Sequence, residues 1–144
     1  MKLNTKYILS LELAKKIAER ATQKANELQV GGAIAVVDDS GNLVYLEKMD
    51  GTMPAASNIA IGKAATSAAF KRPTILLETL IHEKRQVMLC LNGITDTPYV
   101  PLMGAHPIYF DGQIIGAVSV AGAETGENDE IIAKYASEIQ IEIL

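Results

Sequence analysis

The sequence predicts an α+β fold in which a mostly antiparallel sheet is flanked by helices. Two pairs of short apolar runs are each joined by a turn rich in Asp, Gly and Asn, which is the pattern of a β-hairpin. Longer stretches with helical periodicity lie before, between and after these pairs. The predicted order is therefore helix, two strands, two helices, two strands and a helix. Because helices and strands do not alternate singly, a doubly wound parallel sheet is disfavoured.

The first helix is predicted over residues 9–28. Its apolar stripe recurs at helical spacing and consists of Leu9, Leu13, Ile17, Ala21, Ala25 and Leu28. Ser10 is a suitable N-cap, because its hydroxyl can accept a hydrogen bond from a free backbone N–H of the first turn. Gly31 and Gly32 end the helix.

The middle of the chain predicts two further helices, over residues 53–70 and 75–83. Small residues lie along one side of the first of these, together with one lysine: Ala56, Ile59, Ala60, Lys63, Ala64, Ser67 and Ala68. Such a helix can approach a sheet, or a second copy of itself, very closely. Pro73 separates the two helices, because proline disfavours helical geometry in the residue before it. Thr74 is expected to cap the second helix.

The two hairpins frame the rest of the fold. Strands 33–37 and 43–49 form the first, and strands 108–110 and 113–121 form the second. Between the hairpins, residues 92–107 read as a long loop rich in Pro and Gly, and long loops in small domains are usually functional or disordered.

The last helix is expected to begin at Asn128, which acts as its N-cap. Asp129 and Glu130 follow in its first turn, where negative charge is favourable to the helix dipole. Ile131, Ile132, Tyr135 and Ile139 give this helix its apolar stripe.

Composition limits the classes of function. With 144 residues, 49% apolar and 21% charged, the chain is expected to fold as one domain, residues 1–144. The net charge is −4 and the basic residues are scattered, so no nucleic-acid partner is expected. Charged residues interrupt the apolar residues of segment 1–13, so neither a signal peptide nor a membrane partner is expected. Cys90 stands alone, which predicts a cytoplasmic location, and its apolar neighbours predict that it is buried.

Six segments carry a resemblance to a known family. They are residues 35–38, 41–44, 48–51, 59–64, 68–74 and 112–123, followed by the acidic start of the last helix. In this order, the segments cover nearly the whole chain. The sequence resembles the GlcG/HbpS-like family, formerly a domain of unknown function, which includes the C-terminal domain of a propanediol-utilisation cobalamin adenosyltransferase.

The resemblance implies a profilin-like fold, with a central five-stranded antiparallel sheet flanked by helices, and self-assembly into dimers or octamers. Since the apolar runs account for four strands, the fifth is expected around Glu83–Leu91. Haem binding, and in some members haem degradation, is the activity attached to the family name. The chain has no Cys-x-x-Cys-His sequence, so a bound haem is expected to be non-covalent. The first helix lacks the histidine that the adenosyltransferase-associated domain uses for haem.

A ligand site is predicted near the long loop. The residues expected to bind the ligand are Met49, Asp50, Arg72, Met103, Gly104 and His106. The His106 imidazole can serve as an axial haem ligand, a metal ligand or an acid/base. Arg72 is fixed by Pro73 and offers a planar fork to a carboxylate or a haem propionate. The leading hypothesis is a homo-oligomeric accessory protein that binds haem or another small ligand and is linked to small-metabolite catabolism.

Other interpretations remain open. The protein could be an enzyme acting on a small carboxylated metabolite, with His106 as acid/base and Arg72 as carboxylate clamp, or a purely structural subunit. His106 could instead bond to backbone or solvent. Arg72 could pair with Asp38, Asp50 or a neighbouring subunit, and His82 is expected to be exposed at a helix end. No zinc-site or serine-nucleophile motif occurs, so the sequence names no catalytic residue and leaves open whether the protein is an enzyme.

Overall fold

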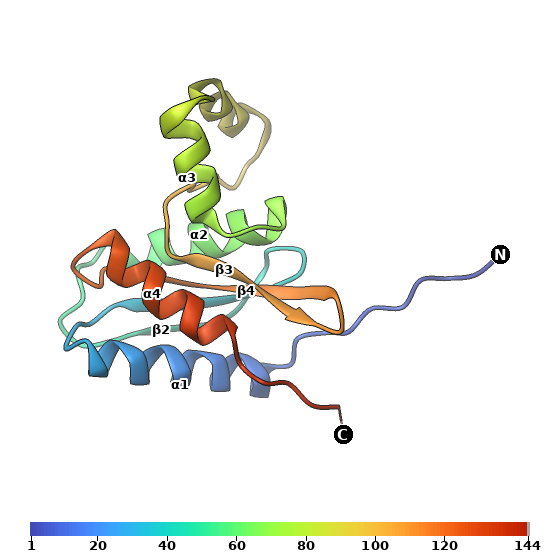
Figure 1. Ribbon diagram of the computed structural model, residues 1–144, viewed down its shortest axis with the longest axis horizontal. Coiled ribbons are helices and arrows are strands. Elements are labelled where there is room, and N and C mark those ends of the chain that lie inside the picture. Colours follow the sequence, from blue (N-terminus) through green and yellow to red (C-terminus); the bar gives the residue numbers. More distant parts are fainter. Residues whose placement is uncertain (144) are drawn as a thin grey trace.

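The computed structural model describes residues 1–143 and has the α+β architecture, with one antiparallel sheet and helices on both faces (Figure 1). The elements are α1 (Leu11–Glu27), β1 (Ala33–Asp38), β2 (Leu43–Lys48), α2 (Ala56–Phe70), α3 (Thr74–Glu83), the 3-10 helix η1 (Gln86–Ile94), β3 (Ala105–Phe110), β4 (Gln113–Ala121) and α4 (Gly126–Ser137). The strand order is β2-β1-β4-β3. Both predicted hairpins are confirmed, and β1 and β4 pair in the centre of the sheet.

The two faces of the sheet are built from side chains of different size. Ile34 and Val36 of β1 belong to the core cluster that α1 and α4 cover, whereas Ala33 and Ala35 face α2. The α2 face is completed by small residues of that helix at four-residue spacing: Ala56, Ala60, Ala64 and Ala68. Small side chains on both sides bring α2 close to the sheet.

The prediction of five strands is wrong for residues 1–143, where the sheet has four. The segment expected to form the fifth strand contains the end of α3 and most of η1. The Met88 N–H donates to the Arg85 carbonyl at 3.0 Å, which is the short three-residue bond of a 3-10 turn. This segment packs against α3 rather than against the sheet, so it has no strand to pair with.

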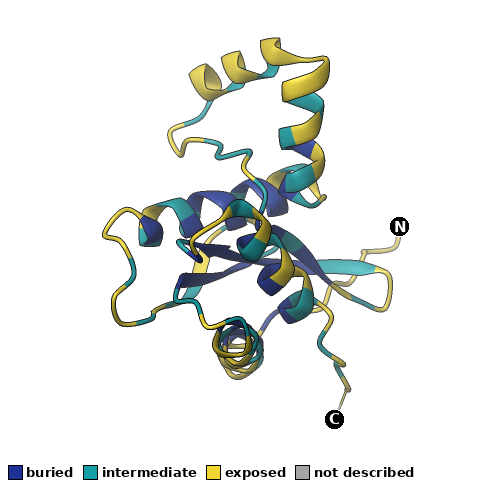
Figure 2. Ribbon diagram, turned by 60° about the vertical axis from the view of Figure 1, so that its left-hand side comes forward, coloured by how far each residue is buried: buried dark blue, intermediate teal, exposed yellow. Residues whose placement is uncertain are grey.

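Residues 74–104 form an arm, comprising α3, η1 and the following loop, that projects from the body of the molecule (Figures 1 and 2). No residue of η1 is buried, and Cys90, which was expected to be buried, is exposed. Large apolar side chains are also exposed along the arm: Leu76, Val87, Leu89, Ile94 and Leu102. The arm therefore presents apolar surface that the chain itself does not cover.

The two ends of the arm meet. Thr74 does not cap α3 as predicted; its buried hydroxyl accepts a hydrogen bond from the Ala105 N–H at 3.1 Å. Strand β3 begins at Ala105 and not at Ile108 as predicted, with Pro107 inside it. Proline is tolerated here because β3 is an edge strand, where a missing N–H costs no ladder bond.

Hydroxyl side chains cap the N-termini of α1 and α4. The Ser10 cap is confirmed, since its side chain accepts a hydrogen bond from a backbone N–H of α1 at 3.1 Å. The prediction that Asn128 caps the last helix is wrong: α4 begins at Gly126 and is capped by Thr125, which accepts from the Asn128 N–H at 3.1 Å. The earlier start places Asp129 within the first turn of a helix that packs on the sheet.

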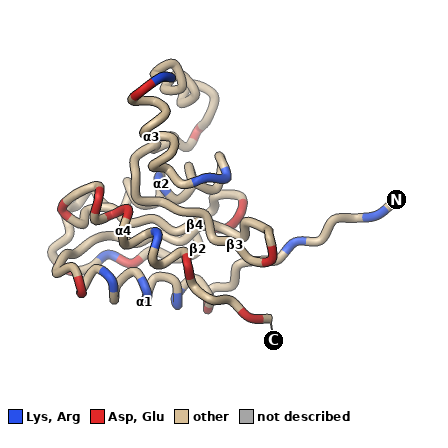
Figure 3. The backbone as a smooth tube through the Cα atoms, viewed as in Figure 1, with Lys and Arg blue, Asp and Glu red and all other residues tan. Residues whose placement is uncertain are grey.

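Basic and acidic residues are interspersed along the chain (Figure 3). The first turn of α4 carries Glu127 and Asp129, which complement the positive end of the helix dipole. Over residues 1–143, no helix has the length and apolar character needed to cross a membrane.

Candidate functional site

A lysine is buried on the face of α2 that packs against the sheet. Lys63 is 1% exposed and is the largest fully buried side chain among the described residues. Its Nζ donates hydrogen bonds to the Met103 carbonyl at 2.9 Å and to Asp129 Oδ2 at 3.2 Å. An ammonium group has three N–H donors, so one donor is available for a further partner.

Asp129 completes this ion pair from α4. Its Oδ1 accepts a hydrogen bond from the Ala123 N–H at 2.9 Å. Burial lowers the pKa of Lys63, and this effect outweighs the opposing attraction of the Asp129, Glu78 and Glu130 carboxylates. Burial also raises the pKa of Asp129, more than Lys63 and the Ala123 hydrogen bond lower it. Both shifts favour the uncharged forms of the two groups.

Gly104 brings the backbone before β3 against the Lys63–Asp129 pair. Its φ is +114°, a conformation that side-chain-bearing residues rarely adopt. A Cβ at this position would lie 2.6 Å from Lys63 Nζ, 2.8 Å from Asp129 Cβ and 2.9 Å from the Val120 carbonyl oxygen. Glycine is therefore required for the close approach that lets the neighbouring Met103 carbonyl reach the lysine.

A cavity of about 370 Å³, which we call the Lys63 cavity, opens beside the pair. Its apolar lining residues are Met53, Ile59, Leu102 and Met103. Its polar lining residues are Lys63, Glu78, Glu124, Thr125 and Asp129, and small residues from 121–123 and 126 complete the wall. The volume lies within the range of about 300–1,000 Å³ that is typical of small-molecule sites.

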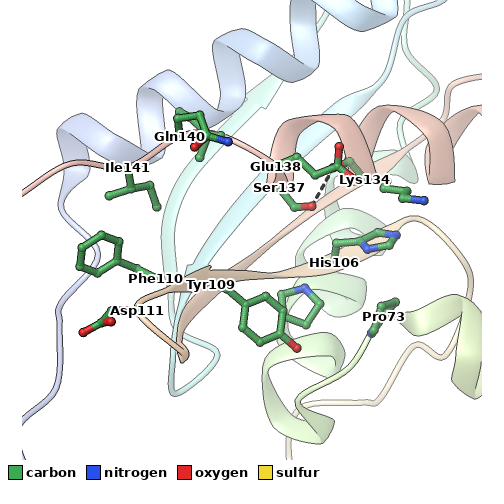
Figure 4. A pocket seen from close by; sticks show the side chains of 12 residues that line it. Pro73, His106, Tyr109, Phe110, Asp111, Lys134, Ser137, Glu138, Gln140 and Ile141 are labelled. Atoms are coloured by element: carbon green, nitrogen blue, oxygen red, sulfur yellow. Dashed lines mark hydrogen bonds between the residues drawn. The ribbon is translucent and has the colours of Figure 1, made fainter.

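A second hollow, the His106 cleft, lies between β3 and the end of α4 and has a volume of about 650 Å³ (Figure 4). His106 Nε2 and Glu130 Oε2 are joined by a hydrogen bond of 2.7 Å, and the two side chains are 12% and 16% exposed. Within the described part of the chain, the buried Glu130 Oε1 has no hydrogen-bond partner. The cleft is lined by Pro73, His106, Pro107, Tyr109, Phe110, Asp111, Lys134, Ser137, Glu138, Ile139, Gln140 and Ile141.

Comparison with known proteins identifies the family. A family model described as "Haem degrading protein HbpS-like" matches residues 9–138. Protein GlcG of Escherichia coli strain K12 is 36% identical over 119 residues, which are 83% of this chain and 85% of that protein. The chain belongs to the HbpS-like family.

Solved structures share the fold. Protein ORFY of Klebsiella pneumoniae superposes with a TM-score of 0.85 at 27% identity, covering 96% of this chain and 94% of that one. A structure described as a PduOC–haem complex superposes with a TM-score of 0.81 at 25% identity, covering 91% of this chain and 94% of that one. The family predicted from the sequence is thus confirmed, and the α+β fold is shared.

Three of the predicted ligand residues lie on β3 or just before it. Met103 lines the Lys63 cavity and its carbonyl holds the lysine, while Gly104 makes that contact sterically possible. His106 lines the neighbouring cleft. These three residues therefore lie close together in the chain, but they belong to two different hollows.

The other three predicted residues lie outside the lining of both hollows. Met49 is partly buried and packs against the core under α1 and α4, and Asp50 is exposed in the turn after β2. Arg72 is exposed, and its Nε donates to the Phe70 carbonyl at 3.0 Å. Its role as a carboxylate clamp stays a prediction. Over residues 1–143, no three His, Cys, Asp or Glu side chains form a group suited to a metal ion.

Sequence reasoning missed Lys63, Asp129 and Glu130 as site residues. A signal for Lys63 was present, because a lysine inside a stripe of alanines must be paired or must line a cavity. Asp129 and Glu130 gave no such signal, since acidic residues in a first turn are explained by the helix dipole alone.

Proposed function

We propose that this protein is a homo-oligomeric accessory protein of small-metabolite catabolism that binds haem non-covalently in the His106 cleft. The observation that carries the proposal is an imidazole on the wall of a large cleft, in a chain that shares its fold with the PduOC–haem complex. Membership of a family described as haem-degrading supports the same ligand.

The residues of the cleft fit a haem. Tyr109 and Phe110 supply aromatic wall from β3 (Figure 4). Pro107 and Ile139 add apolar lining. Lys134 offers a cation to a propionate. The volume of about 650 Å³ is in the range of cofactor sites.

His106 would hold the iron, and Glu130 would orient the ring. A carboxylate that accepts a hydrogen bond from one ring nitrogen fixes the tautomer of a ligating histidine and raises its basicity. Here Glu130 binds Nε2 and leaves Nδ1 for the metal. Bound haem would supply a redox-active iron, and the protein residues would position and shield it.

A haemin titration, followed at the Soret band, tests this function. We expect saturable binding to the wild type and its loss in His106→Ala. The matched control is His82→Ala, because His82 is the other histidine of the chain and is exposed at the end of α3. Equal binding by the wild type and His106→Ala, or loss of binding in His82→Ala, would contradict His106 as the ligand.

The projecting arm supports self-association. Val87 and Leu89 are 65% and 56% exposed on η1, and a second copy could cover them. Light scattering should show an assembly between a dimer and an octamer that Leu89→Glu dissociates. Leu11→Glu, at an exposed leucine of α1, is the control and should leave the assembly intact. A monomeric wild type would contradict the oligomer.

One observation favours the second candidate, an enzyme acting on a small carboxylated metabolite. The His106–Glu130 pair has the arrangement of an acid/base histidine oriented by a carboxylate. Arg72 precedes Pro73, which lines the same cleft. Loss of a turnover in His106→Ala, with the assembly intact and no haem bound by the wild type, would favour the enzyme.

A further inference from the structure

We propose that the Lys63 cavity is a second, separate site that binds a small uncharged carbonyl compound, and that this compound forms an imine with Lys63 Nζ. This site does not depend on haem binding, since its lining shares no residue with the His106 cleft. The proposal rests on a buried amine in a cavity wall, a carboxyl group bonded to that amine, and the charge of the remaining lining.

The hydrogen bonds of Lys63 link α2 to the loop before β3 and to α4, but stability alone does not explain a lysine here. Replacing a buried ion pair by apolar residues is often neutral or stabilising by about 1–4 kcal/mol, so Lys63 and Asp129 are poorly explained as a structural pair. The surrounding face of α2 consists of Ala, Gly, Ser and Thr, and an apolar residue would continue it. A buried lysine at this position, next to a cavity, is the arrangement that amine chemistry requires.

The amine must lose its proton before it can act as a nucleophile. The charged groups that act on it are Asp129 and Glu130 from α4 and Glu78 from α3, and all three favour the protonated form. Burial outweighs them and lowers the pKa of Lys63, so its uncharged fraction at neutral pH exceeds that of an exposed lysine.

Asp129 is placed to move the protons of the reaction, because its Oδ2 is 3.2 Å from Nζ. Nζ attacks the carbonyl carbon, a C–N bond forms, and Asp129 carries a proton from nitrogen to oxygen to give the carbinolamine. The carboxylic acid form of Asp129 then protonates the hydroxyl, which leaves as water while the nitrogen lone pair forms the C=N bond. The regenerated carboxylate removes the last N–H proton, so one water is released and no oxidant is needed.

The lining defines the class of compound. Glu78 and Glu124 would repel a carboxylated ligand, so a neutral aldehyde or ketone is favoured over a keto acid. Ile59 and Leu102 can accept a short alkyl group. The start of α4 lines the cavity as well, and a helix N-terminus stabilises the negative charge that develops on the carbonyl oxygen.

Reductive trapping tests the proposal on the full chain. Protein at pH 7 is incubated with acetaldehyde and a borohydride reductant, and each lysine is assayed by peptide mass spectrometry. We expect at least about tenfold more N-ethylation on Lys63 than on the exposed Lys48 and Lys71, because the cavity holds the reactants together. Pyruvate, the charged comparison, should modify Lys63 at least about tenfold less than acetaldehyde does.

Two variants complete the test. Lys63→Met should remove the adduct at this position, with folding checked by circular dichroism. Ile59→Trp keeps Lys63 and Asp129 but fills the cavity, and it should abolish trapping at Lys63 while labelling of Lys48 and Lys71 is unchanged. The proposal is overturned if Lys63 of the folded wild type reacts no faster than Lys48 and Lys71, if pyruvate reacts equally well, or if Ile59→Trp reacts like the wild type.

Discussion

Gly104→Ala is expected to destabilise the protein severely, and the cost has two sources. At φ +114°, a side chain strains the backbone by about 1–3 kcal/mol. The new Cβ would also lie 2.6 Å from Lys63 Nζ and 2.8 Å from Asp129 Cβ, and relieving such overpacking typically costs about 1–3 kcal/mol. We expect a total loss of about 4 kcal/mol. This is a large part of the free energy of unfolding of a typical domain, which is roughly 5–15 kcal/mol.

Two other glycines separate these sources. Gly51 has φ +79° with no atom near a new Cβ, so Gly51→Ala should cost only about 1 kcal/mol of backbone strain. Gly93 has an ordinary φ and open space, so Gly93→Ala should change stability by less than about 0.5 kcal/mol.

Urea unfolding followed by circular dichroism, at one protein concentration, measures all three variants. With an m-value of about 2 kcal/mol/M, the midpoint should fall by about 2 M for Gly104→Ala and about 0.5 M for Gly51→Ala. Equal losses in Gly104→Ala and Gly51→Ala would refute the tight contact with Lys63 and Asp129. A large loss of stability in Gly93→Ala would show that the free space around a new Cβ does not rank the three glycine variants.

Three further predictions concern stability. Burial lowers the pKa of Lys63 in the folded protein, so at a pH between that lowered pKa and 10.5 the unfolded chain binds a proton that the folded chain lacks. The wild type should therefore gain stability relative to Lys63→Met as pH rises from 7 to 10, and parallel stability–pH curves would contradict this. Thr74→Val leaves the Ala105 N–H buried without its acceptor and should cost about 1–3 kcal/mol in urea unfolding, whereas Thr74→Ser should cost less than half of that. Arg20→Met removes a hydrogen bond of 2.7 Å to the Tyr135 carbonyl and a cation–π contact at 4.2 Å with the Tyr135 ring, so the Tm should fall by an amount equivalent to about 1–3 kcal/mol. An unchanged Tm would show that apolar packing alone makes the contact between α1 and α4.

Local patterns were sufficient for most of the elements. The apolar period of α1, its Ser10 cap and the Asp-Gly turn between β3 and β4 are written in neighbouring residues, and the structure has all three. The start of β3 was missed because Pro107 reads as loop, and only the position of β3 at the sheet edge makes proline acceptable there.

The candidate site was harder to predict because its contacts are long-range. Lys63 and Asp129 are 66 residues apart in the chain, and no periodicity relates them. The loop residues Met103, Gly104 and His106 were predicted as ligand residues from the Pro- and Gly-rich composition around them. Residues 83–91 were expected to hold a strand because the family resemblance implied a fifth one, and an apolar run looks the same whether or not a sheet is within reach.

The hydrogen bond between Thr74 and Ala105 has a consequence for how this fold can vary. Residues 75–104 leave the body at Thr74 and return to it at Ala105, where the Thr74 hydroxyl accepts a hydrogen bond from the Ala105 N–H at 3.1 Å. Closing a longer loop between fixed ends costs only about 0.6 kcal/mol per doubling of its length. Insertions, deletions or replacements within η1, where no residue is buried, therefore leave the sheet pairing untouched. Related chains can diversify what they meet at the tip of the arm while keeping the same body.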